Sequence, residues 1–176
     1  MLNKNTALQM HMLFNPRSYI LISACLLGEK VRFDGKTKKV ESLILERWQA
    51  DKQLLSLCPE VAGGLTVPRP AAEIQDGDVI NILGENISLN FHRGAQEALR
   101  LCKKHQIRMA ILKEGSPSCG VNRINDGSFT RTKIIGQGIT STLLQKHGVQ
   151  VFSEQQLNEA AAYFYVTLQQ QAYRQD

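Results

Sequence analysis

Four short, mainly apolar runs recur along the chain and predict the strands of a buried sheet. They are Ser18–Cys25, Gln53–Cys58, Ile107–Lys113 and Val149–Ser153. The first is nearly continuous in its hydrophobicity and rich in β-branched residues, and the others resemble it, as is typical of strands covered on both faces of a parallel sheet. We therefore expect four strands that lie between layers of helix.

Helical spacing fills the intervals between these runs. Apolar residues recur at three- and four-residue steps from Val40 to Trp48 and from Ala95 to Cys102, and two more helices are predicted over Ile139–Lys146 and from Glu154 to about Tyr173. The alternation of strand and helix predicts a single three-layer α/β domain with a mainly parallel, Rossmann-like sheet.

Two segments fall outside this alternation. Residues 1–17 show neither clean alternation nor a capped helix, so we treat them as an N-terminal extension to a domain over residues 18–176. The stretch Gly63–Ser88 holds two prolines and two glycine-containing turn pairs, which predict a long ordered loop with a small β excursion. Loops of this length in compact domains are usually functional.

The composition is that of an ordinary globular chain. Its 176 residues are 43% hydrophobic and 21% charged, with a mean hydropathy of −0.23, which argues against disorder, coiled coil and collagen-like repeats. The longest apolar stretch, Ile20–Leu27, is much shorter than the roughly 20 residues that a membrane-spanning helix needs. The first residues do not resemble a secretory signal, so we expect a soluble protein of the cytoplasm.

Positive charge is concentrated in one part of the chain. The formal net charge is +5, yet the segment from Arg93 to Lys133 alone holds nine basic and three acidic residues, a net of +6. Such a concentration favours an anionic partner, a nucleotide or RNA among them. A solvated helix face with scattered loop lysines would give the same pattern.

Three of the four cysteines follow predicted strands. Cys25 ends the first apolar run, Cys58 ends the second, and Cys119 comes six residues after the third. Because ligands of open parallel sheets bind beyond the carboxyl ends of the strands, we expect these three thiols at one crevice. Cys102 instead lies on the apolar side of its helix, where a free cysteine packs as a small hydrophobic residue.

A glycine follows each of the three cysteines and allows the main chain to come close to a bound group. The segments are Cys25-Leu-Leu-Gly28, Cys58-Pro-Glu-Val-Ala-Gly63 and Ser116-Pro-Ser-Cys-Gly120. Three thiolates form a soft site that favours zinc, copper(I) or iron–sulfur. A 4Fe-4S cluster with one open iron and a zinc with water as its fourth ligand both fit three cysteines, and isolated buried thiols are the alternative. Cysteine phosphatase or rhodanese-like chemistry fits poorly, because Cys25-x6-Arg32 and Cys119-x3-Arg123 miss the Cys-x5-Arg spacing.

Seven motifs, in order, resemble the thiouracil desulfurase family, long catalogued as domain of unknown function 523. They are Ile22–Gly28, Val31–Gly35, Cys58–Leu65, Pro68–Glu73, Phe91–Ala95, Ile111–Gly120 and Asp126–Thr130. The similarity runs from Ile20 to about Glu154 and takes in the long loop from Gly63.

This resemblance implies a 4Fe-4S cluster held by Cys25, Cys58 and Cys119. Its fourth iron would bind the sulfur of a thiolated base such as 2-thiouracil, and the reaction would be a non-redox, hydrolytic removal of that sulfur. It also implies catalytic roles for Glu60 and Ser116.

Neighbouring polar side chains are candidates for substrate binding: Arg69, Lys113 and Ser118. The competing interpretations are structural, namely an ion pair of Glu60 with Arg32 or Arg69, ion pairs of Lys113 and Arg69 with Glu114 and Glu73, and a turn cap by Ser116. The expected partner is a small thiolated base or nucleoside, with RNA as a further candidate and neither DNA nor a membrane. The alternative function is a zinc- or cluster-binding, RNA-associated module without desulfurase activity.

Overall fold

Four parallel strands form the central sheet, and they coincide with the four apolar runs of the sequence. They are β1 (Ile20–Ser23), β2 (Leu54–Leu57), β5 (Met109–Leu112) and β8 (Gln150–Ser153), in the order β2-β1-β5-β8. Every pairing is parallel, with Ile22 opposite Ser56 on one side and Ile111 on the other. The mainly parallel α/β sheet expected from the sequence is confirmed.

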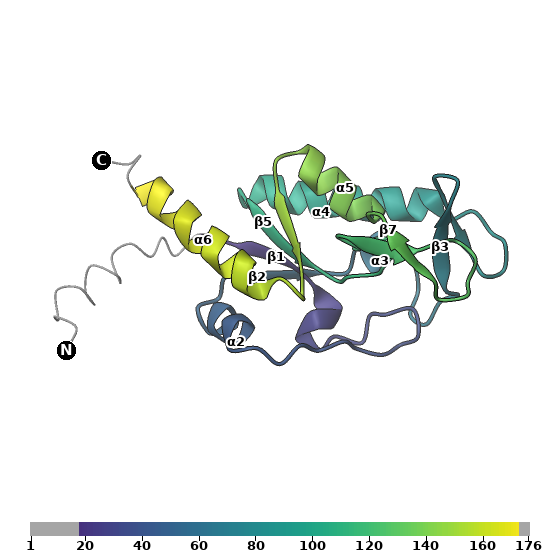
Figure 1. Ribbon diagram of the computed structural model, residues 1–176, viewed down its shortest axis with the longest axis horizontal. Helices are drawn as coiled ribbons and strands as arrows, with labels where there is room; N and C mark the ends of the chain where they lie inside the picture. The colour runs from purple at the N-terminus through teal and green to yellow at the C-terminus, as the bar shows by residue number, and fades with distance from the viewer. Residues whose placement is uncertain (1–17, 173–176) are drawn as a thin grey trace.

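Helices cover both faces of this sheet (Figure 1). They are α2 (Leu43–Ala50), α4 (Ser88–Lys104), α5 (Ile139–Lys146) and α6 (Leu157–Ala172). Alternate side chains of β1 enter the two layers. Leu21 packs with the cluster on α4 and α5, whereas Ile22 packs with Trp48 and Phe164 beneath α2 and α6. Cys102 is buried in the α4 layer, as its helical spacing indicates.

Two small antiparallel ribbons stand apart from the sheet. The first, β3 (Ala72–Gln75) with β4 (Asp78–Asn81), is the β excursion expected within the long loop. The second, β6 (Arg123–Asn125) with β7 (Lys133–Ile135), was not predicted, because its strands have only three residues and β7 is exposed along its length.

Two short helical turns follow the first two strands directly. The 3₁₀ turn η1 (Ala24–Leu27) follows β1, and α3 (Pro59–Ala62) follows β2. The second packs so closely on α4 that a Cβ atom built on Gly94 would lie 1.8 Å from the carbonyl oxygen of Pro59. Glycine is therefore required there, and this contact fixes the position of the turn that begins at Cys58.

These elements belong to residues 18–172, the part of the chain that the computed structural model describes. The expected N-terminal extension over residues 1–17 lies outside it. No helix within residues 18–172 has both the length and the hydrophobicity to cross a membrane.

Candidate functional site

A cavity of about 380 Å³ opens at the carboxyl ends of the strands, and three cysteines line it. Cys25 lies in η1 after β1, Cys58 is the N-cap of α3 after β2, and Cys119 lies in the loop after β5. The structure thus brings together the three thiols that the sequence placed beyond the strands.

Burial dominates the acidity of these thiols. It raises the pKa of Cys25 to about 11, with the neighbouring Cys58 adding to the effect. Burial likewise raises the pKa of Cys58 and that of Cys119, although a hydrogen bond with Ser23 opposes the shift at Cys119. A bound metal would reverse this preference, because coordination deprotonates a thiol.

The donor set fits a metal–sulfur group. Three cysteines line one cavity, Cys25 and Cys119 buried and Cys58 half-buried, and sulfur ligands select soft metals. Within residues 18–172, however, no three His, Cys, Asp or Glu side chains meet closely enough to hold one metal ion. Three thiols can serve a cluster with one open iron or a zinc with a water ligand.

Glu60 is held beside the cysteines by two polar contacts. Its Oε2 accepts hydrogen bonds from the Arg69 guanidinium at 2.8 Å, and its Oε1 lies 3.4 Å from the Ser116 hydroxyl, which donates to it. The ion pair with Arg69, one of the interpretations open from sequence, is therefore present. It orients the carboxylate, and Oε1 remains on the side of Ser116.

Ser116 takes part in two interactions at once. Its Oγ accepts hydrogen bonds from the backbone amides of Ser118 and Cys119, both at 3.1 Å, while its hydroxyl faces Glu60. The same side chain therefore caps the turn that carries Cys119 and contacts the carboxylate.

The three side chains expected to bind substrate have different surroundings. Arg69 lines the cavity but also donates to the carbonyl oxygens of Val31 and Thr66, both at 3.0 Å, so its guanidinium is fully engaged. Lys113 lines the cavity and pairs with Glu154 rather than with the Glu114 carboxylate. Ser118 is not brought to the cavity, because its fully buried hydroxyl lies 2.9 Å from that of Thr140.

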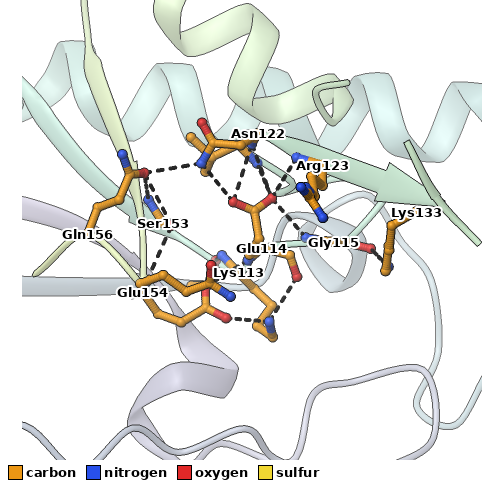
Figure 2. Close-up of polar contacts among 12 residues, drawn as sticks. Lys113, Glu114, Gly115, Asn122, Arg123, Lys133, Ser153, Glu154 and Gln156 are labelled. Carbon is orange, nitrogen blue, oxygen red and sulfur yellow. Dashed lines mark hydrogen bonds and ion pairs between the residues drawn. The ribbon is translucent and has the colours of Figure 1, made fainter. Parts of the chain in front are cut away.

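Glu114, two residues after β5, organises the loop that carries Cys119, and its contacts with Asn122 and Arg123 are drawn in Figure 2. Its carboxylate accepts hydrogen bonds from the backbone amides of Val121, Asn122 and Arg123 at 3.0–3.1 Å, and from the Asn122 side chain at 2.9 Å. Partial burial opposes ionisation, but these hydrogen bonds prevail and hold the pKa of Glu114 below its usual value. Its position at a strand end was the signal in the sequence that could have identified it.

Replacing Glu114 with glutamine should destabilise this loop. The amide nitrogen of glutamine would face backbone N–H groups, and we expect a loss of about 1–2 kcal/mol in the free energy of unfolding at pH 7. Because the folded-state pKa lies below the unfolded one, the difference should be complete above the unfolded value near 4.5 and shrink as the pH falls below it. Urea unfolding of cluster-free protein at several pH values measures this, with Glu159→Gln on the exposed side of α6 as control.

Equal stability of Glu114→Gln and the unmodified protein at pH 7 would contradict the assigned role. The role would also be contradicted if the difference in free energy of unfolding between the two proteins grew toward acid pH.

The far wall of the cavity comes from the two ribbons and supplies residues that the sequence did not single out. Glu73 on β3 is buried, and its Oε2 accepts a hydrogen bond from the Phe129 amide at 2.9 Å. Asn125 on β6 and Lys133 on β7 also line the cavity, and Lys133 donates to the carbonyl oxygen of Gly115 at 3.1 Å. Burial lowers the pKa of Lys133. Of the nine basic residues between Arg93 and Lys133, the cavity takes in Lys113 and Lys133.

Cys102 stands at a Cys-x5-Arg spacing from Arg108, and both border a second cavity of about 350 Å³. A phosphatase loop carries its cysteine as a thiolate, whereas this one sits on the buried side of α4 and burial raises its pKa to about 12. The spacing therefore does not make Cys102 a nucleophile.

Comparisons with known proteins point in one direction. A family model described as 2-thiouracil desulfurase matches residues 20–156. The uncharacterized protein YbbK of Bacillus subtilis (strain 168) is 37% identical over 153 residues, which span 80% of this chain and 98% of the relative. A solved structure described as the [4Fe-4S]-dependent thiouracil desulfidase TudS (DUF523Vcz) superposes with a TM-score of 0.84 at 48% identity, covering 85% of this chain and 99% of that one.

Proposed function

The chain belongs to the 2-thiouracil desulfurase family, and from this premise we propose that it is a 4Fe-4S-dependent enzyme that removes sulfur from thiolated pyrimidine bases such as 2-thiouracil. The observation that carries the proposal is the meeting of three free cysteines with Glu60 and Ser116 at one cavity. The cavity of about 380 Å³ would hold both the cluster and the substrate, which favours a small substrate such as a single base. We further propose that the chain from residue 18 onward acts as one catalytic domain.

Cys25, Cys58 and Cys119 would hold the cluster. When bound, it would supply a Lewis-acidic iron that lacks a cysteine ligand and is open to the sulfur of the substrate. Lys113 lies close enough to Cys25 to favour its thiolate, so its positive charge would help to balance the anionic ligands.

Glu60 would act as the general base. The oxygen of a water molecule bonds to the carbon of the thiocarbonyl group, and the proton of that water passes to the carboxylate. The carbon–sulfur bond then breaks, and the sulfur leaves with the bonding electron pair. It receives one proton from the carboxylate and one from the new hydroxyl group, so that water is exchanged for hydrogen sulfide. Carbonyl replaces thiocarbonyl with no net transfer of electrons, so neither an oxidant nor a reductant is consumed.

Ser116 and Arg69 would serve this step through Glu60. The Ser116 hydroxyl, 3.4 Å from Oε1, would orient the attacking water against the base. The Arg69 guanidinium, 2.8 Å from Oε2, keeps the carboxylate turned toward the cavity. Arg69 is then a positioning residue, and its engaged guanidinium leaves the substrate to other groups.

Anaerobic isolation followed by a sulfide-release assay tests the proposal. We expect about four iron atoms per chain, the broad brown absorbance of thiolate-bound iron, and equal amounts of sulfide and uracil formed from 2-thiouracil. Stoichiometric zinc with salt-sensitive RNA binding and no sulfide release would instead support the RNA-associated module. A protein isolated without air that holds no iron would overturn the desulfurase proposal.

A further inference from the structure

The side-chain oxygen of Asn125 is a buried hydrogen-bond acceptor without a donor within residues 18–172. Its side-chain Oδ1 is fully buried and has no hydrogen-bond partner. Within residues 18–172, the other fully buried side-chain atoms in this condition both belong to Gln53, which is not among the residues that line the cavity. Because buried polar groups are almost always paired, an unpaired acceptor in a cavity wall indicates a place for a donor that arrives with a ligand.

The fold presents this side chain from a braced position. Asn125 is the last residue of β6 and lies opposite Lys133 on β7. The loop that follows is fastened to β3, since the Phe129 amide donates to Glu73 at 2.9 Å and the Gln75 side chain donates to the carbonyl oxygen of Gly127. The backbone beside Asn125 is thus held in place. Its Oδ1, which makes no hydrogen bond within residues 18–172, can be brought to the cavity by a rotation of the carboxamide about χ2.

Three neighbouring polar groups of the cavity have partners within the protein. Glu60 is bound by Arg69, Lys113 by Glu154, and Lys133 by the carbonyl oxygen of Gly115. Asn125 differs from these three groups, because its Oδ1 has no partner within residues 18–172. A carboxamide offers a ligand both an acceptor and a donor.

We propose that Asn125 determines base specificity by pairing with the –NH–C(=O)– edge of the thiolated pyrimidine, an inference that rests on the proposed function. Oδ1 accepts a hydrogen bond from the N3–H of 2-thiouracil, and Nδ2 donates one to the oxygen at C4. A carboxamide is complementary to this edge, since each partner presents one donor beside one acceptor. The sulfur at C2, adjacent to N3, is then left to face the cysteines.

Methylated substrates separate this pairing from other contacts. In 3-methyl-2-thiouracil the N3–H is lost, whereas 1-methyl-2-thiouracil keeps the whole edge. We expect Asn125→Ala and the shape-conserving Asn125→Leu to lower kcat/KM for sulfide release about 10- to 100-fold with 2-thiouracil and with its 1-methyl derivative. The rate with the 3-methyl derivative, already low in the unmodified protein, should change little in the variants. The variants should therefore lose most of the preference for the 1-methyl derivative that the unmodified protein shows.

Two further measurements use anaerobically prepared holoprotein and do not depend on turnover. The dissociation constant for uracil, which carries the same edge without sulfur, should rise by a similar factor in both variants. Their iron content and thermal midpoint should stay unchanged, because the atoms removed have no partner in the protein. Asn158→Ala, at an exposed position on α6, is the matched control and should change neither binding nor rate.

The outcomes separate the two proposals. Suppose that the unmodified protein is active and that the variants keep both its uracil affinity and its preference between the methylated substrates. That result overturns the role of Asn125 but not the proposed function. A fall in iron content or thermal midpoint that accounts for the lost activity also overturns it, since Asn125 would then be structural. An unmodified holoprotein that releases no sulfide from any of the three substrates overturns the proposed function, and uracil binding still decides the role of Asn125.

Discussion

Replacing Glu60 with glutamine should slow sulfide release from 2-thiouracil by about 10²- to 10⁴-fold, the usual contribution of a general base. Glutamine keeps the size of the side chain and an oxygen that can accept the Arg69 hydrogen bonds, so the turn that carries Cys58 should stay in place. What is lost is a group that can take a proton from water. Steady-state kinetics on anaerobic protein measures the effect, with iron content determined on the same samples.

Iron content distinguishes a base from a merely structural ion pair. Glu60→Gln should keep about four iron atoms per chain while it loses turnover. Glu159→Gln, exposed on α6, is the control and should behave as the unmodified enzyme. Activity within a few-fold of normal in Glu60→Gln would remove the carboxylate from the mechanism, and loss of iron in parallel with activity would make its role structural.

Exchange of a single cavity cysteine for serine should remove the cluster. Serine is a poor ligand for the soft metal–sulfur site. The iron content should therefore fall from about four atoms per chain to nearly none in each of Cys25→Ser, Cys58→Ser and Cys119→Ser, and sulfide release should be lost completely. Metal analysis and the visible spectrum of anaerobic samples measure this directly.

Cys102 provides the matched control for these substitutions. It is equally a buried free cysteine, but it lies in the core beneath α4 and not in the cavity. Cys102→Ser should keep iron and turnover and lose about 1–3 kcal/mol in the free energy of unfolding, because a hydroxyl replaces a thiol in apolar surroundings. Full iron content in any of the three cavity variants would exclude that cysteine as a ligand.

Hydrophobic periodicity predicted the sheet because its two central strands, β1 and β5, are buried along their whole length and its edge strands are also mainly apolar. Every predicted run contains one strand of the sheet. It missed the start of α4, which begins seven residues before Ala95. The first turns of that helix pack on the backbone of α3 through Gly94, where only a residue without a side chain fits. A helical pattern of large apolar residues is therefore interrupted at this point. Tertiary contact has overridden the local signal there.

The position of the cysteines followed from a topological rule, since parallel strands end at one edge of a sheet. The ribbon β6–β7 follows no such rule. Its two strands are too short for alternation to be recognised, and the side chains of β7 are exposed. The sequence therefore offered no reason to select Asn125, although the adjacent Asp126–Thr130 is one of the seven motifs of the resemblance. Ser118 is the opposite case. It was selected because it precedes Cys119 in the sequence, but its side chain is buried beside Thr140 and does not line the cavity.

The two walls of the cavity differ in how they are built, and this difference bears on laboratory evolution of substrate range. The cysteine wall follows the strands of the central sheet. The other wall is formed by two ribbons that stand apart from that sheet and are held to each other by loop hydrogen bonds. Variants selected for bulkier thiolated rings should therefore gather on β3–β4 and β6–β7. Chemistry and selectivity can then diverge separately within one fold.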